Sequence, residues 1–222
     1  NQGTLEFWVR PNWNGNDGQP HYIFDMYDGS SNRLLLAKDT ANNATLEITA
    51  GGVTRTAAVS ASAWTAGTWY HLVAVWDKNN TVNGTNYLYT YVNGTGAGAL
   101  NAPGSFGTVT SSFQIGQTYA SLNLFNGVIA GRILNRPLTS AEVTALYASG
   151  AGHTDTFTVT PDTVWMGAYS DSDDDAVFQH RGQSVSAISN GATESTLTLG
   201  EAVGSRSWKD NDRVVVWDGT GY

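Results

Sequence analysis

The sequence predicts an all-β fold, a sandwich of two sheets that carries one short helix. Apolar and polar residues alternate along most of residues 3–134, which is the period of half-buried strands. Turn signals recur about every 8–12 residues, a spacing typical of β-sandwiches. Hydrophobic residues make up 41% of the 222-residue chain, so it can bury a sizeable core, and disorder along its whole length is excluded.

The first strand shows the alternation clearly. Within GTLEFWVR, at 3–10, Leu5, Phe7 and Val9 share one face. TWYHLVAVWD, at 68–77, is apolar on both faces, which predicts a strand buried on both sides of a sheet. Further strands are expected at 21–27, 45–49, 53–59, 86–92, 112–117 and 125–134.

Two of these strands carry additional expectations. In HYIFDMY, strict alternation places Tyr22, Phe24 and Met26 on one side. NYLYTYV is followed by a two-residue turn at Asn93-Gly94, a pair that favours tight hairpins.

One segment departs from the period of two. Thr139 and Glu142 have the spacing of a capping box, and Leu138 with Val143 can form a hydrophobic staple around it. The pattern therefore predicts a short helix, with Gly150 as its left-handed stop.

The composition changes after this helix. About five further strands are expected in the polar segment that follows. We therefore divide the chain into a β-sandwich at 1–152 and a second part at 153–222, which is either a small β-module or an extension of the first sheet.

Three blocks of the first part resemble laminin G-like domains, and they occur in the family order. GTLEFWVRP resembles the opening strand, TWYHLVAVWD with NYLYTYVNG resembles the central pair, and FNGVIAGRILNRPLTSAEVTALY resembles the closing block. The resemblance covers about residues 3–150. It implies a concanavalin A-like jelly-roll sandwich used for binding glycans or proteins, often with calcium at one edge.

The sequence departs from the family pattern in two places. The usual first strand is missing, so either upstream sequence was removed or a later segment such as TDTFTVT (154–160) pairs with the first sheet. The acidic pair of the closing block is replaced by Ala130 and Gly131, so the usual calcium site is expected to be impaired.

Candidate ligand-binding residues combine flat aromatic rings with amide and carboxylate groups. Sugar rings stack on aromatic side chains, while their hydroxyls need polar partners. Trp13 is expected to be an exposed loop aromatic beside Asn14 and Asp17, and two weaker candidates lie elsewhere. The full set is Trp13, Asn14, Asp17, Tyr27, Asp28 and Tyr119.

Calcium is the cofactor that the sequence suggests. Asp171, Asp173 and Asp175 alternate along an acidic loop and can supply several oxygen ligands, although the loop lacks the glycine and distal glutamate of an EF-hand. A solvated acidic turn is the alternative. The loop around Asp17 is a second candidate, for calcium or for a sugar.

Catalytic motifs are absent from the sequence. No paired-carboxylate motif of a jelly-roll glycanase occurs, and Glu6 and Glu47 are expected to be solvated, although a pair from separate strands stays open. No HExxH or GxSxG motif is present. His71 is interpreted as a structural histidine, and Trp8, Trp69 and Trp76 as core residues.

The functional hypothesis is a non-catalytic recognition module of a larger extracellular, cell-surface or virion protein. Its expected partner is a glycan or a cell-surface protein, and it can assemble as a homo-oligomer. A net charge of −8 argues against nucleic acid, and no apolar run is long enough for membrane insertion. A carbohydrate-active enzyme, hydrolase or lyase, and a structural spacer are the alternatives.

Overall fold

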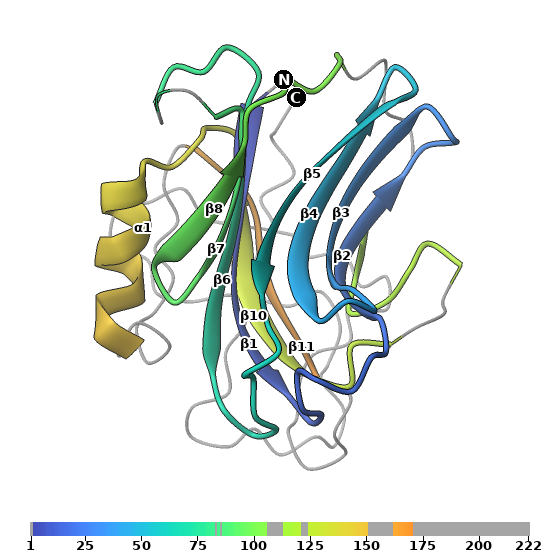
Figure 1. Ribbon diagram of the computed structural model, residues 1–222, viewed down its shortest axis with the longest axis vertical. Coiled ribbons are helices and arrows are strands. Elements are labelled where there is room, and N and C mark those ends of the chain that lie inside the picture. The colour runs from blue at the N-terminus through green and yellow to red at the C-terminus, as the bar shows by residue number, and fades with distance from the viewer. Residues whose placement is uncertain are drawn as a thin grey trace, which may run out of the picture.

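The structure is a computed structural model that describes residues 2–82, 84, 86–105, 113–120, 124–150 and 162–170, with the backbone alone for 164–170. Two antiparallel sheets pack face to face (Figure 1). The all-β prediction and the single short helix are confirmed for these residues. The second part, 153–222, lies outside them except for residues 162–170.

The six-stranded sheet has the order β11-β10-β1-β6-β7-β8. Its strands are β1 (Gln2–Pro11), β6 (Tyr70–Asp77), β7 (Leu88–Val92), β8 (Thr95–Ala99), β10 (Gly127–Leu134) and β11 (Thr163–Ser170). The five-stranded sheet has the order β5-β4-β3-β2-β9. Its strands are β2 (His21–Tyr27), β3 (Asn32–Lys38), β4 (Asn43–Ala50), β5 (Val53–Ser60) and β9 (Phe113–Ile115).

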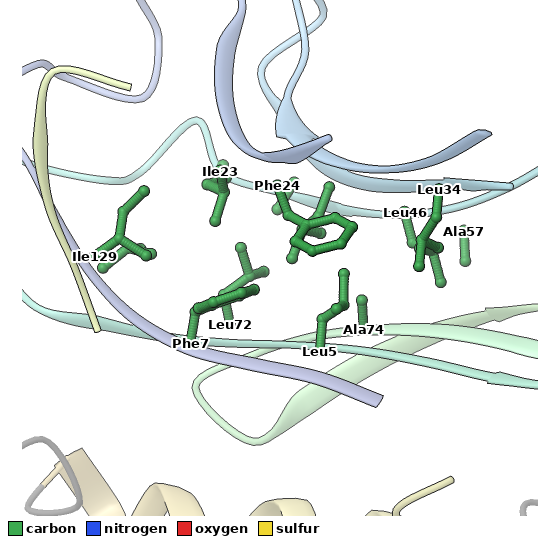
Figure 2. Close-up of a cluster of buried hydrophobic side chains, with 14 of the residues drawn as sticks. Leu5, Phe7, Ile23, Phe24, Leu34, Leu46, Ala57, Leu72, Ala74 and Ile129 are labelled. Atoms are coloured by element: carbon green, nitrogen blue, oxygen red, sulfur yellow. The ribbon is translucent and has the colours of Figure 1, made fainter. Parts of the chain in front are cut away.

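The main core lies between the two sheets, where their inward side chains meet (Figure 2). Leu5, Phe7 and Val9 of β1 are fully buried there, as their alternation predicts. Leu46 and Ile48 of β4 face them from the other sheet. Burying such side chains stabilises the fold by roughly 1.5–3 kcal/mol each.

Two features of the five-stranded sheet differ from the prediction. β3 was not expected, because Leu34, Leu35 and Leu36 form a continuous apolar run without alternation. In β2 the register shifts between Tyr22 and Phe24, so these two residues face opposite sides rather than one. This shift decides which β2 side chains point outward.

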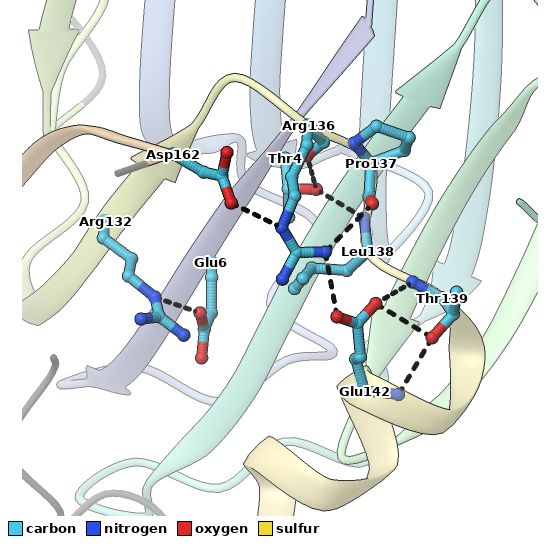
Figure 3. A network of polar contacts seen from close by, with 9 residues as sticks. All are labelled: Thr4, Glu6, Arg132, Arg136, Pro137, Leu138, Thr139, Glu142 and Asp162. Atoms are coloured by element: carbon cyan, nitrogen blue, oxygen red, sulfur yellow. Dashed lines mark hydrogen bonds and ion pairs between the residues drawn. The ribbon is translucent and has the colours of Figure 1, made fainter. Parts of the chain in front are cut away.

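Helix α1 (Ser140–Tyr147) covers the outer side of the six-stranded sheet (Figure 1). The predicted capping box between Thr139 and Glu142 is present, and Leu138 and Val143 are both buried in a second apolar cluster. The helix ends earlier than expected, because Ala148 already has a left-handed backbone with φ 47°. Figure 3 shows the cap and its polar neighbours.

β11 occupies the edge of the six-stranded sheet, beside β10. The strand lies beyond the proposed boundary at 152, whereas the expected edge segment 154–160 lies outside the described residues. Asp162 Oδ2 accepts a hydrogen bond from Arg136 Nε at 3.0 Å, and Arg136 Nη1 pairs with Glu142 Oε1 at 2.8 Å (Figure 3). The start of β11 is thus tied to the cap of α1.

Candidate functional site

The outer face of the five-stranded sheet carries a stacked pair of tyrosines. Tyr27 ends β2, and Tyr119 follows β9, the strand that pairs with β2. Their ring centroids lie 4.0 Å apart with an interplanar angle of 12°. Tyr119 is 51% exposed. The sequence named both tyrosines, and the strand pairing brings them together from positions far apart in the chain.

An ion pair fixes the position of this tyrosine pair. Asp25 Oδ1 and Oδ2 accept from Arg33 Nε and Nη2 at 2.9 and 3.0 Å, a bidentate geometry. Asp25 Oδ2 also accepts from the backbone N–H of Tyr119 at 3.0 Å. The guanidinium carbon of Arg33 lies 5.9 Å from each tyrosine ring. We call Asp25, Tyr27, Arg33 and Tyr119 the tyrosine–arginine site.

The electrostatics of the site keep Arg33 charged. Its hydrogen bonds to Asp25 raise the pKa of Arg33, partial burial opposes them, and the charge of Glu47 adds to the rise. Asp25 is fully buried, whereas Arg33 remains partly exposed. The guanidinium therefore offers donors to solvent beside an aromatic surface.

Amide groups border the site. Gln114 of β9 lies opposite Asp25 in the strand register, and Gln114 Oε1 accepts from Gln117 Nε2 at 2.9 Å. Both glutamines are half-buried. An exposed ring, guanidinium donors and amides together suit a hydroxyl-rich ligand with one apolar face.

Asp25 and Arg33 were missed by the sequence reading. The signal for Asp25 was a lone carboxylate inside the apolar strand IFDMY. Arg33 stands across the following hairpin, where it pairs in register with Tyr27 and is the diagonal neighbour of Asp25.

The expected exposure of Trp13 is wrong. Its side chain is 8% exposed and belongs to the main core. Trp13 Nε1 donates to Phe125 O at 2.5 Å, and its ring stacks on His21 with centroids 3.8 Å apart. The loop folds inward because burial of the large indole ring is favourable, and the Phe125 carbonyl accepts a hydrogen bond from its single N–H donor.

The loop after Trp13 uses its polar groups internally. Asn14 Oδ1 accepts from the backbone of Ala66 at 3.1 Å. Asp17 Oδ2 lies 2.7 Å from His21 Nε2, and its other oxygen accepts from the fully buried Lys38. Burial alone would raise the pKa of Asp17, but hydrogen bonds from Lys38, Gln19 and His21 lower it to about 2. Asp17 is thus committed to neutralising Lys38.

Asp28 follows Tyr27 at the start of a hairpin turn and is half-buried. Its backbone N–H donates to Asn32 O at 2.9 Å, which closes the turn. Asp28 thus lies next to the tyrosine–arginine site along the chain.

The calcium prediction at Asp171, Asp173 and Asp175 falls outside the described residues and stays a prediction. In the described segments, no group of three or more His, Asp or Glu side chains is placed to hold a metal. Gly131, where the resemblance led us to expect an acidic residue, lies against β1. A Cβ there would come within 2.2 Å of both Glu6 O and the Phe7 ring, so a side chain requires the strands to move apart.

A laminin G-like family model, described as the concanavalin A-like lectin/glucanases superfamily, matches residues 1–144. The chain belongs to this superfamily. The resemblance noted in the sequence is thereby confirmed, and so is the predicted jelly-roll class of the sandwich. No curated protein matches the chain.

Solved structures similar to this concanavalin A-like domain have low sequence identity. Domain 4 of AbnA, a GH43 extracellular arabinanase from Geobacillus stearothermophilus, solved with arabinotriose, is 21% identical with a TM-score of 0.50 over 66% of each chain. The CBM40 of the Ruminococcus gnavus IT-sialidase is 15% identical, with a TM-score of 0.49 over 66% of this chain and 82% of that chain. A heptameric SAP-like pentraxin from Limulus polyphemus is 15% identical, with a TM-score of 0.46 over 66% and 69%.

The concanavalin A-like fold separates the two strand glutamates. Glu6 alternates with core residues of β1 and faces outward from the six-stranded sheet, whereas Glu47 faces outward from the five-stranded sheet. The two cannot form a catalytic pair, which needs carboxyl groups within about 5–10 Å. The expectation that Glu6 is solvated is wrong, because it is 1% exposed and bonds Arg132 Nε at 2.6 Å.

The remaining candidates of this concanavalin A-like domain are a histidine and three tryptophans of the six-stranded sheet and its borders. His71 is fully buried, and its Nε2 lies 3.4 Å from Glu6 Oε1, as expected for a structural histidine. Trp8 and Trp76 are buried as predicted. Trp69 is only half-buried, and the guanidinium of Arg10 lies 5.6 Å from its ring.

Proposed function

We propose that this domain is a non-catalytic glycan-recognition module whose ligand contacts the tyrosine–arginine site. The observation that carries the proposal is the exposed Tyr119 ring, stacked on Tyr27 and fixed through its own backbone N–H to Asp25. A preorganised aromatic surface loses little conformational freedom when a sugar ring stacks on it. Arg33 and Gln114 supply hydrogen-bond partners for hydroxyl groups around that ring.

The superfamily and its structural relatives support a sugar as the ligand. The AbnA domain was solved with arabinotriose. The separation of Glu6 from Glu47 supports binding without hydrolysis. A cell-surface protein is the second candidate partner, because an exposed tyrosine beside an arginine is also typical of protein interfaces.

The proposed setting is a larger protein at a cell surface, outside the cell or on a virion. In the described segments, no helix is long and apolar enough to cross a membrane. The acidic, cysteine-free composition supports this setting.

A glycan array followed by calorimetry tests the proposal. We expect dissociation constants in the micromolar-to-millimolar range, equivalent to about −8 to −4 kcal/mol, because the site is open and small. Tyr119→Ala should weaken binding at least about tenfold, since the sugar ring loses its stacking partner. Tyr119→Phe should retain most of it.

Leu100→Ala is the matched control, because Leu100 is 67% exposed and lies at the end of β8 in the other sheet. It should leave binding unchanged. Equal binding by the wild type and Tyr119→Ala would refute the site. Release of reducing ends or unsaturated sugars from a bound polysaccharide would refute the non-catalytic role.

A further inference from the structure

We infer that the tyrosine–arginine site selects uncharged saccharides and rejects acidic ones such as uronates and sialates, an inference that rests on the proposed function. It follows from how the charges are arranged on the outer face of the five-stranded sheet. An arginine in a binding site commonly pairs with a ligand carboxylate. Its surroundings argue for the opposite preference.

The strand register fixes which side chains share this outer face. Positions that alternate with the core residues point outward. The charged residues among these positions are Asp25, Arg33 and Glu47. Among these described positions there is one cation, Arg33, against two carboxylates, so the formal charge is +1 − 2 = −1.

The two carboxylates flank the arginine's strand from both sides. Asp25 on β2 and Glu47 on β4 both pair in register with Leu35 of β3, and Arg33 lies two residues along β3 on the same face. Asp25 neutralises the guanidinium through two hydrogen bonds. Glu47 adds a negative charge without a hydrogen bond to Arg33 in the described chain.

Arg33 still has hydrogen-bonding capacity for a neutral ligand. Asp25 engages Nε and Nη2, while Nη1 has no protein acceptor among the described residues. Its N–H groups can donate to hydroxyl or ring oxygens. A ligand carboxylate gains little from a guanidinium that is already paired, and it is repelled by Glu47.

The experiment uses an array of glycan pairs matched in chain length and composition but not in charge, such as methyl-esterified and saponified oligogalacturonides. The signal of this site is the part lost in Tyr119→Ala. We expect that signal on neutral members, with their acidic counterparts bound at least about fivefold more weakly at low salt.

Glu47→Gln should raise Tyr119-dependent binding of the acidic members about threefold to fivefold and leave the neutral members unchanged. Asp162→Asn is the matched control, since it removes the same charge from a half-exposed position on the other sheet. It should change neither class.

The outcomes separate the two claims. Tyr119-dependent binding that is as strong for acidic as for neutral members would overturn the selectivity and leave the recognition function standing. The selectivity is likewise overturned if Glu47→Gln and Asp162→Asn change the binding of the acidic members by the same factor. If no glycan shows a Tyr119-dependent signal, the proposed function fails, and the selectivity fails with it.

Discussion

The two outer faces of the sandwich carry the same chemical unit in two settings. On the six-stranded sheet, Glu6 pairs with Arg132, and both are buried (Figure 3). On the five-stranded sheet, Asp25 pairs with Arg33, and the arginine is partly exposed. Each ion pair lies beside stacked aromatic rings. The difference is the cover, because α1 packs on the six-stranded sheet alone.

The aromatic residues of the covered face show what that cover does. Tyr147 of α1 stacks on Trp8 and His71, with ring centroids 6.1 and 6.3 Å apart. Tyr119 occupies the corresponding role on the other face, yet half of its surface meets solvent. A buried carboxylate–arginine pair serves stability, whereas the same pair at an open surface is available to a ligand.

The largest expected effect is on the covered face. Glu6→Gln breaks a buried ion pair by removing its carboxylate, so the free energy of unfolding should fall by about 3–5 kcal/mol. Urea unfolding measures it. The double variant Glu6→Gln with Arg132→Met should recover part of the loss, because no unpaired charge remains. A loss below about 1 kcal/mol for Glu6→Gln would contradict the structural role.

The pH dependence of stability should be governed in part by Asp17, in the loop before β2. The fold lowers the pKa of Asp17 from 3.8 to about 2, so its ionised form stabilises the native state above pH 4, by about 1 kcal/mol because solvent screens this exposed group. That contribution is lost as the pH falls from about 4 through about 2. Asp17→Asn should lose it at pH 7 and show a flatter acid dependence in urea titrations. An unchanged acid profile would contradict the pairing with Lys38.

The open face should respond more weakly to loss of its carboxylate. Asp25→Asn should cost about 1–2 kcal/mol in thermal or urea unfolding, because Arg33 can recover water that Arg132 cannot. Glycan binding should nevertheless fall, since the N–H of Tyr119 loses its charged acceptor. A cost as large as that of Glu6→Gln would erase the distinction between the faces.

The smallest stability effect is expected at Tyr119 itself. Tyr119→Ala removes a ring that is half exposed, so unfolding should change by less than about 1 kcal/mol. Tyr147→Ala on the covered face is the matched variant. It should lower the free energy of unfolding by more, because the Tyr147 ring packs on Trp8 and His71. Melting curves of the two variants compare them directly.

The sequence was sufficient for the fold because alternation and turn signals are local. It did not predict β3, because the apolar run of that strand does not alternate. In β2 it placed Tyr22 on the same face as Phe24, whereas a register shift between them puts the two on opposite faces. It also failed for Trp13, because a polar loop does not reveal that His21 and Phe125 lie within reach.

The site was only partly predictable for a related reason. Tyr27 and Tyr119 were named as separate candidates, and their contact depends on the pairing of β2 with β9, which no local pattern encodes. Asp25 was not among the predicted site residues. A carboxylate in an apolar strand, with an arginine across the next hairpin, is the local pattern that indicates a buried ion pair.

Amide chemical-shift mapping by NMR tests the central claim most directly. The backbone N–H of Tyr119 donates to Asp25 and therefore reports on the open face. Titration with a neutral oligosaccharide selected on the array should shift the amides of Tyr119 and Gln114, and leave those of Trp8 and Tyr147 in place. Shifts confined to Trp8, Tyr147 and their neighbours would place the ligand on the helix-covered face and contradict the account.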